Sequence, residues 1–173
     1  MRTSRSRGFT IIELMIVMVI LGVMVSLAGP SMRDLIIRTR LKSAASDLHT
    51  SLMLARSEAI KRNAAMQLVP VDATDWAKGW TVRVQASGVV LVTQEAHQNV
   101  AVATTNSAYV AAALATVNFS GTGRESGSAG AGVAFVISSA EYPSIQARCV
   151  VLDPSGRAAV RQDRDLNAAN GCN

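Results

Sequence analysis

Apolar and polar positions divide the chain into three stretches with different spacing. The first is an almost unbroken apolar run over residues 9–29, in which Glu13 is the only charged side chain. Because about 20 apolar residues allow a helix to cross a bilayer, the run predicts a transmembrane helix over 9–30. No small-residue cleavage site follows it, so we expect this run to remain on the mature protein rather than leave as a signal peptide.

In the second stretch, apolar residues recur at steps of three and four, which is the spacing of one helix face. These positions are Leu41, Ala45, Leu48, Leu52, Ala55 and Ala59. Charged and polar side chains occupy most positions between them. The pattern predicts an amphipathic helical stem over residues 31–63, with its apolar face packed on the domain that follows.

The third stretch, residues 64–173, alternates short apolar runs with turn-forming residues, as β-strands do. Eight strands are expected, at 66–71, 80–85, 89–94, 100–104, 116–119, 133–138, 148–153 and 157–162. The aromatic side chains expected in the core are Trp76, Trp80, Phe119, Phe135 and Tyr142. The predicted fold class is α+β, a long N-terminal helix packed on a C-terminal antiparallel sheet or sandwich.

The chain has 17 basic and 12 acidic side chains, a net charge of +5 that raises the question of nucleic-acid binding. The excess is concentrated around the apolar run, in the first eight residues and in the stem, whereas residues 63–173 hold seven basic and eight acidic side chains. Basic residues before an apolar span favour a cytoplasmic N-terminus. The overall charge therefore reports mainly on membrane topology.

No catalytic constellation is recognisable. His49 and His97 are the only histidines, and we expect both to be solvated. Neither they nor the two cysteines have close metal-ligand spacing, and the Gly/Ser-rich segment 121–132 lacks the lysine of a phosphate-binding loop. We expect no enzyme activity, no metal and no cofactor, and an exposed mobile loop at 121–132.

Glu13 needs an explanation, because a carboxylate inside an apolar helix costs about 2.5–3.5 kcal/mol near the bilayer centre. Either it pairs with a cation or it lies near the headgroups and is solvated. The surrounding sequence, RGFTIIELMIVMVILGVMVSLAGP, resembles the class III signal of type IV pilins and type II secretion pseudopilins. The resemblance implies cleavage after Gly8 by a prepilin peptidase and N-methylation of Phe9. It also implies that Glu13 pairs with the Phe9 amino group of a neighbouring subunit.

Two further segments resemble the GspH/FimT group of that family, namely LARSEAIKRN at the stem end and DWAKGW at residues 75–80. The likeness is good over residues 7–85 and extends weakly to 119–123 and 156–157. It implies a pilin-like chain with a leader (1–8), a transmembrane half-helix (9–30), a stem (31–63) and a β-rich domain (64–173).

The function that this resemblance implies is that of a minor pilin in a type IV pilus, with a type II secretion pseudopilin as the alternative. Its partners would be other major and minor pilins, bound through the N-terminal helix. The subunit would reside in the bacterial inner membrane before assembly, with its N-terminus cytoplasmic, and in the extracytoplasmic pilus afterwards.

Some members of the group bind DNA through a basic element near the C-terminus. The corresponding place here is Gly156-Arg157, with Arg161 four residues on, and Arg148 and Arg164 nearby. Alternate strand positions would put Arg157 and Arg161 on one face. A solvated hairpin is the competing interpretation.

Cys149 and Cys172 are the only cysteines. An extracytoplasmic domain permits a disulfide between them, which would stabilise it by about 3 kcal/mol in the chain-entropy description. The alternative is two buried free thiols.

Overall fold

Helix α1 (Ile11–Arg62) is 52 residues long, and the regular elements described after it are strands. In this computed structural model, residues 8–72, 75–106, 114–127 and 132–164 are described, without the side chains of 27–31 and 106. The chain divides into two compact units, residues 1–36 and 37–173. Within the second unit, the C-terminal half of α1 packs on the β-domain.

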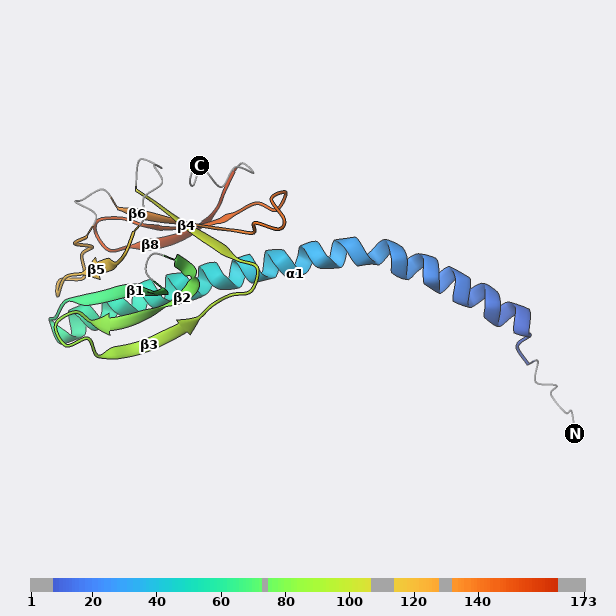
Figure 1. The fold of residues 1–173 in the computed structure, drawn as a ribbon, viewed down its shortest axis with the longest axis horizontal. Helices are drawn as coiled ribbons and strands as arrows, with labels where there is room; N and C mark the ends of the chain where they lie inside the picture. Colours follow the sequence, from blue (N-terminus) through green and yellow to red (C-terminus); the bar gives the residue numbers. More distant parts are fainter. Residues whose placement is uncertain (1–7, 73–74, 107–113, 128–131, 165–173) are drawn as a thin grey trace, which may run out of the picture. The chain divides into compact units, whose positions relative to one another are not determined.

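The described residues contain eight strands (Figure 1), which are β1 (Met66–Asp72), β2 (Asp75–Val84), β3 (Val90–Glu95), β4 (Ala101–Asn106), β5 (Val117–Phe119), β6 (Val133–Ser138), β7 (Arg148–Leu152) and β8 (Ala158–Gln162). All eight expected strands are therefore confirmed. Most ends agree within one or two residues. The exception is β2, which begins at Asp75 because its first residues pair across the β1–β2 turn with Asp72.

The strands form two antiparallel four-stranded sheets with the orders β3-β2-β1-β5 and β4-β6-β7-β8. Strands β1 to β3 and strands β6 to β8 are each consecutive neighbours in their sheet. The chain passes to the second sheet between β3 and β4, returns to the first sheet with β5, and enters the second sheet again at β6. The predicted α+β architecture, a long helix on antiparallel sheets, is confirmed.

The apolar face of the stem forms the centre of the core. Its six predicted positions are each at most 1% exposed, and they share one hydrophobic cluster with both sheets. The cluster includes Leu68 from the first sheet and Phe135 and Val150 from the second. Alternate positions of β6 and β7, such as Val136 and Cys149, form a separate small cluster on the other face of the second sheet.

Aromatic side chains join the sheets to each other and to the stem. The Trp76 and Phe135 rings, from β2 and β6, meet edge to face with centroids 4.9 Å apart. The Trp80 indole N–H donates a buried 2.9 Å hydrogen bond to Ser51 Oγ on α1. The prediction of a core position is confirmed for the two tryptophans, Phe119 and Phe135, whereas Tyr142 is only partly buried at the core's edge.

The first half of the glycine-rich segment is only partly the exposed loop that composition suggested, because Thr122, Arg124, Ser126 and Gly127 are exposed but Gly123 and Glu125 are buried. Gly123 is buried with φ = 74°, and a Cβ there would lie 2.6 Å from Ile60 Cδ1 on α1. A Cβ at Gly156, where φ is 80°, would collide with the carbonyl oxygen of Gly123. The glycines are required because two turns and the helix end approach one another too closely for side chains. Residues 128–131 lie outside the described residues.

Candidate functional site

The N-terminal site is built around the first turn of α1. The Glu13 backbone N–H donates a 3.3 Å hydrogen bond to Thr10 Oγ1, so Thr10 acts as the N-cap. Glu13 lies in the first turn of the helix, where a carboxylate also interacts favourably with the helix dipole. Phe9 precedes the helix and is 82% exposed. Gly8 and Phe9 therefore form an exposed segment directly before the turn that carries the carboxylate.

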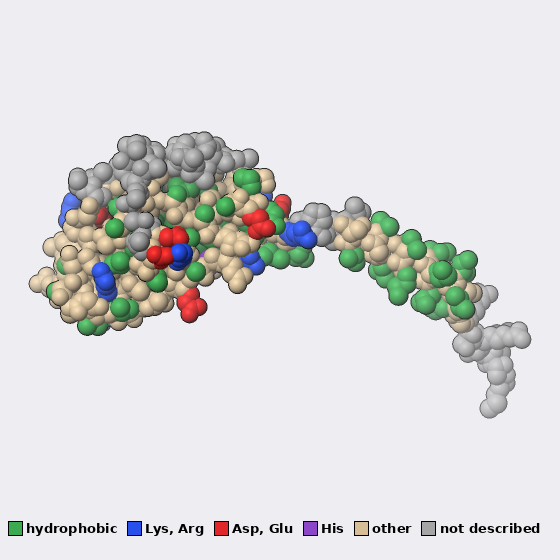
Figure 2. Space-filling view, in the orientation of Figure 1, with side chains coloured by type: hydrophobic (Ala, Val, Ile, Leu, Met, Phe, Trp, Pro, Cys, Tyr) green, Lys and Arg blue, Asp and Glu red, His purple; other side chains and the backbone are tan. Residues whose placement is uncertain are grey.

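The helix that follows is apolar on every side. Its large hydrophobic side chains from Phe9 to Val25 are each at least 45% exposed, and Figure 2 shows them gathered along this stretch of α1. No helix among the described residues combines the length and the hydropathy needed for a membrane crossing. An exposed apolar surface of this extent indicates contact with other molecules.

The four arginines singled out near the C-terminus do not form one group. Arg148 pairs with Gln162 across the β7–β8 ladder, on the sheet face that carries Val150 and packs toward α1. Arg161 pairs with Cys149 and therefore lies on the opposite face. Arg157 is exposed in the turn before β8, and Arg164 is exposed beyond the end of β8. The predicted basic patch is thus divided between two faces.

The turn that holds Arg157 is fixed by Asp153. Its Oδ1 accepts hydrogen bonds from the Ser155 hydroxyl and, at 3.1 Å, from the Arg157 backbone N–H. The Ser155 hydrogen bond, helped by the N–H of Arg157, holds the pKa of the Asp153 carboxyl below its usual range, although partial desolvation opposes the shift. Asp153 therefore organises the hairpin, and its charge offsets that of the neighbouring arginine.

Cys149 is fully buried in β7 and is not a free thiol. Cys172, its expected partner, lies outside the described residues, so the disulfide between the two remains a prediction.

Both histidines make specific contacts, so the expectation of two solvated side chains is wrong. His97 Nε2 lies 3.2 Å from Asp47 Oδ2 on the stem, and its ring is tilted against Trp80 with centroids 6.4 Å apart. His49 Nε2 lies 3.3 Å from the Ala158 carbonyl oxygen. These contacts were missed because each joins residues that are distant in the sequence.

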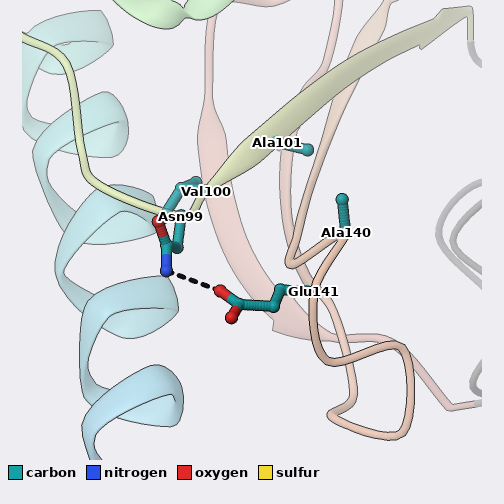
Figure 3. A pocket seen from close by; sticks show the side chains of 5 residues that line it. All are labelled: Asn99, Val100, Ala101, Ala140 and Glu141. Atoms are coloured by element: carbon teal, nitrogen blue, oxygen red, sulfur yellow. Dashed lines mark hydrogen bonds between the residues drawn. The ribbon is translucent and has the colours of Figure 1, made fainter.

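A cavity of about 230 Å³ lies where the β3–β4 connection meets the loop after β6. Figure 3 shows Asn99 and Glu141 facing each other across it, with the Asn99 amide donating a 2.7 Å hydrogen bond to Glu141 Oε2. Asn99 has φ = 58°, in the left-handed region that asparagine tolerates. The hydrogen bond joins the two loops. We therefore interpret this cavity as a result of loop packing and do not treat it as a ligand site.

A long N-terminal helix on two antiparallel sheets, preceded by a short basic segment and an exposed Phe9, defines a pilin-like protein. Residues 44–156 match the family described as type II transport protein GspH, and residues 3–29 match the prokaryotic N-terminal methylation motif. The chain belongs to the GspH family. No curated protein sequence matches the chain at a significant level.

Solved structures share the fold at low sequence identity. The Pseudomonas aeruginosa type IV minor pilin FimU, in crystals of space group P21, has a TM-score of 0.62 at 22% identity, covering 75% of this chain and 97% of FimU. Its P65 crystal form has a TM-score of 0.59 at 21% identity, covering 73% and 99%. The minor pseudopilin EpsH from the Vibrio cholerae type 2 secretion system has a TM-score of 0.51 at 11% identity, covering 71% and 95%.

Proposed function

We propose that the chain is a minor pilin that is incorporated into a type IV pilus and has a structural, assembly-priming role with no catalytic step. The observation that carries this proposal is the exposed apolar stretch from Phe9 to Val25, in which the first turn of α1 carries a single carboxylate, Glu13. Membership of the GspH family and the methylation motif support it.

In this proposal, prepilin peptidase cleaves after Gly8, and the new α-amine of Phe9 is methylated. The apolar helix anchors the subunit in the inner membrane, N-terminus toward the cytoplasm, until it enters the filament. Within the filament, Glu13 of one subunit pairs with the Phe9 amine of its neighbour. Pairing is favourable because a carboxylate removed from water is strongly destabilised without a compensating cation.

The test replaces Glu13 with alanine in the full-length chain. We expect the subunit to be cleaved and to accumulate in the membrane, but to be depleted from pili sheared off the cell surface. Asp34→Ala, which removes an exposed acid outside the apolar run, is the matched control and should assemble normally. Unchanged incorporation of the Glu13→Ala chain would refute the pairing.

The alternative is a type II secretion pseudopilin, which the description of the family and the fold shared with EpsH favour. A deletion strain distinguishes the two functions when twitching motility and protein secretion are scored together. Loss of twitching with normal secretion supports the pilus, whereas the reverse result supports the secretion system.

DNA binding during transformation is the third candidate, and it now depends on the exposed Arg157 and Arg161. Binding through phosphate contacts weakens steeply with added salt. A gel shift with the detergent-solubilised full chain should therefore show salt-sensitive binding that is lost in Arg157→Ala/Arg161→Ala. Absence of such binding removes this candidate without affecting the pilus proposal.

A further inference from the structure

A second cavity, of about 250 Å³, lies between the stem and the second sheet. Lys42, Ser46 and His49 line it from α1, where steps of four and three place them on one helical face. Arg148 from β7 and Val160 from β8 line the other side. Arg148 reaches it because it lies on the sheet face that packs toward the helix.

Among the described residues, the side chains that line this cavity carry positive charge and no negative charge. Lys42 and Arg148 are cationic at neutral pH, and no acidic side chain is among the described residues that line the cavity. Within the described part of the chain, neither side chain makes a hydrogen bond or an ion pair. The acid nearest along the stem, Asp47, contacts His97 instead. The two cations therefore remain available to an anion from outside.

The other lining residues restrict what this anion can be. His49 Nε2 lies 3.3 Å from the Ala158 carbonyl oxygen, which can act only as a hydrogen-bond acceptor. This hydrogen bond fixes the orientation of the imidazole that lines the cavity. Ser46 adds a hydroxyl, and the partly exposed Val160 adds an apolar surface. A volume of 250 Å³ lies just below the range typical of small-molecule sites. It suits one side chain that has an oxyanion at its end and methylene groups behind it.

We propose that this cavity binds the carboxylate of an aspartate or glutamate presented by a neighbouring subunit. The inference rests on the proposed function, because that function supplies the neighbour. A protein carboxylate fits better than nucleic acid, since two cations beside an apolar side chain in a small cavity suit one anion, whereas a phosphate backbone needs a continuous basic surface. Arg161, the nearest additional cation on β8, lies on the opposite sheet face.

The test is NMR titration of the full-length chain in detergent, with histidine isotopically labelled. The chain has two histidines, so His49 reports on the cavity and His97 is an internal reference outside it. The probe is N-acetylglutamate α-amide, whose only charge is on the side chain. Its neutral counterpart is N-acetylglutamine α-amide, and inorganic phosphate is the third titrant.

We expect the glutamate probe to shift the His49 signals saturably and to leave those of His97 unchanged. Lys42→Gln and Arg148→Gln should each weaken binding by about fivefold, the scale of one partly exposed charge pair. The matched controls Lys61→Gln and Arg124→Gln, at exposed cations outside the cavity, should not weaken it. An unchanged His97 signal in each variant verifies that the fold is intact.

Several results would overturn the proposal. These are no saturable shift of His49, an equal shift with the glutamine amide, or binding of phosphate without binding of the carboxylate. A second experiment tests whether the carboxylate comes from a neighbouring subunit. The double variant Lys42→Glu/Arg148→Glu should be incorporated into pili less than the control Lys61→Glu/Arg124→Glu. Equal incorporation of the two variants contradicts a neighbouring subunit as the source. Because the titration needs no filament, its failure is distinguishable from failure of the Glu13→Ala assembly test.

Discussion

His97 Nε2, in the connection between β3 and β4, lies 3.2 Å from Asp47 Oδ2 on the stem helix. The contact is partly shielded, because the His97 side chain is 20% exposed and that of Asp47 is 37% exposed. The imidazole also lies against Trp80, whose indole N–H is hydrogen-bonded to Ser51 on the same helix. The β3–β4 connection therefore contacts the stem through His97, and β2 is hydrogen-bonded to the stem beside it through Trp80.

Breaking the His97–Asp47 contact should destabilise the β-domain modestly. When the imidazole carries a proton on both nitrogens, His97→Ala and Asp47→Ala should share a coupling free energy of about 0.2–1 kcal/mol, the range for exposed ion pairs. The measurement is urea unfolding of both single variants and the double variant, followed by tryptophan fluorescence. Strictly additive effects in this double-mutant cycle would contradict a direct interaction.

Ser51→Ala should cost more than its size suggests. The substitution leaves the buried Trp80 indole N–H without its acceptor, and an unsatisfied buried donor costs about 1–3 kcal/mol. Trp80→Phe in the Ser51→Ala background should add less destabilisation than Trp80→Phe alone, because the orphaned donor is removed as well. Thermal unfolding of the four chains measures this. Thr50→Ala, at an exposed hydroxyl on the same helix, is the control.

Gly156→Ala should destabilise the domain by about 2 kcal/mol or more, since it combines a strained positive φ with a collision against backbone. Gly88→Ala is a matched control, because Gly88 has φ = 69° but nothing within 4 Å of an added Cβ. It should show only the strain of a left-handed alanine, about 1 kcal/mol. Equal losses of unfolding free energy in the two variants would show that close packing at Gly156 contributes nothing.

Thr10→Ala should loosen the first turn of α1 by about 1 kcal/mol, because it removes the N-cap acceptor for the Glu13 N–H. Hydrogen exchange of the Glu13 amide should then accelerate by about fivefold. Thr10→Ser keeps the hydroxyl and should restore slow exchange. If the alanine variant exchanges no faster, the Thr10 hydroxyl is not the cap.

Acidification should weaken the β7–β8 hairpin through Asp153. Its folded-state pKa is lowered by the Ser155 hydroxyl and the Arg157 N–H. A lowered folded-state pKa gives a stabilisation that is complete above the unfolded-state pKa, about 4, and is lost as the pH falls through the folded-state pKa. Asp153→Asn should remove this part of the pH dependence below about pH 4, as measured by urea unfolding. Glu141→Gln, at an exposed acid outside the hairpin, should retain it.

The parts of the fold that sequence pattern predicted are those governed by local periodicity. Steps of three and four identified six buried positions of the stem, although Ile37, Ala44 and Ser51 are buried as well, and alternation with turn residues located the eight strands of the described residues. The N-cap was also within reach, since Thr10 and Glu13 have the spacing of a capping box.

The parts that escaped prediction depend on contacts between distant residues. Nothing in the local sequence brings Lys42 to Arg148 or Asp47 to His97. Separation of Arg148 from Arg161 depends on strand register, because a shift of one position moves a side chain to the other face of the sheet. The expected loop at 121–132 was misjudged in its first half, because glycine marks close approach as readily as it marks flexibility.

The composition of the core also constrains the order of folding. Leu48 and Leu52 of the stem share one cluster with Val150 and Leu152, which are contributed by the next-to-last strand. Entropy of loop closure must be overcome before such distant contacts form, and this slows folding. During synthesis β1 and β2 leave the ribosome directly after the stem and can cover part of its apolar face, but the rest remains uncovered until β6 and β7 are available, when nearly the whole chain has been made.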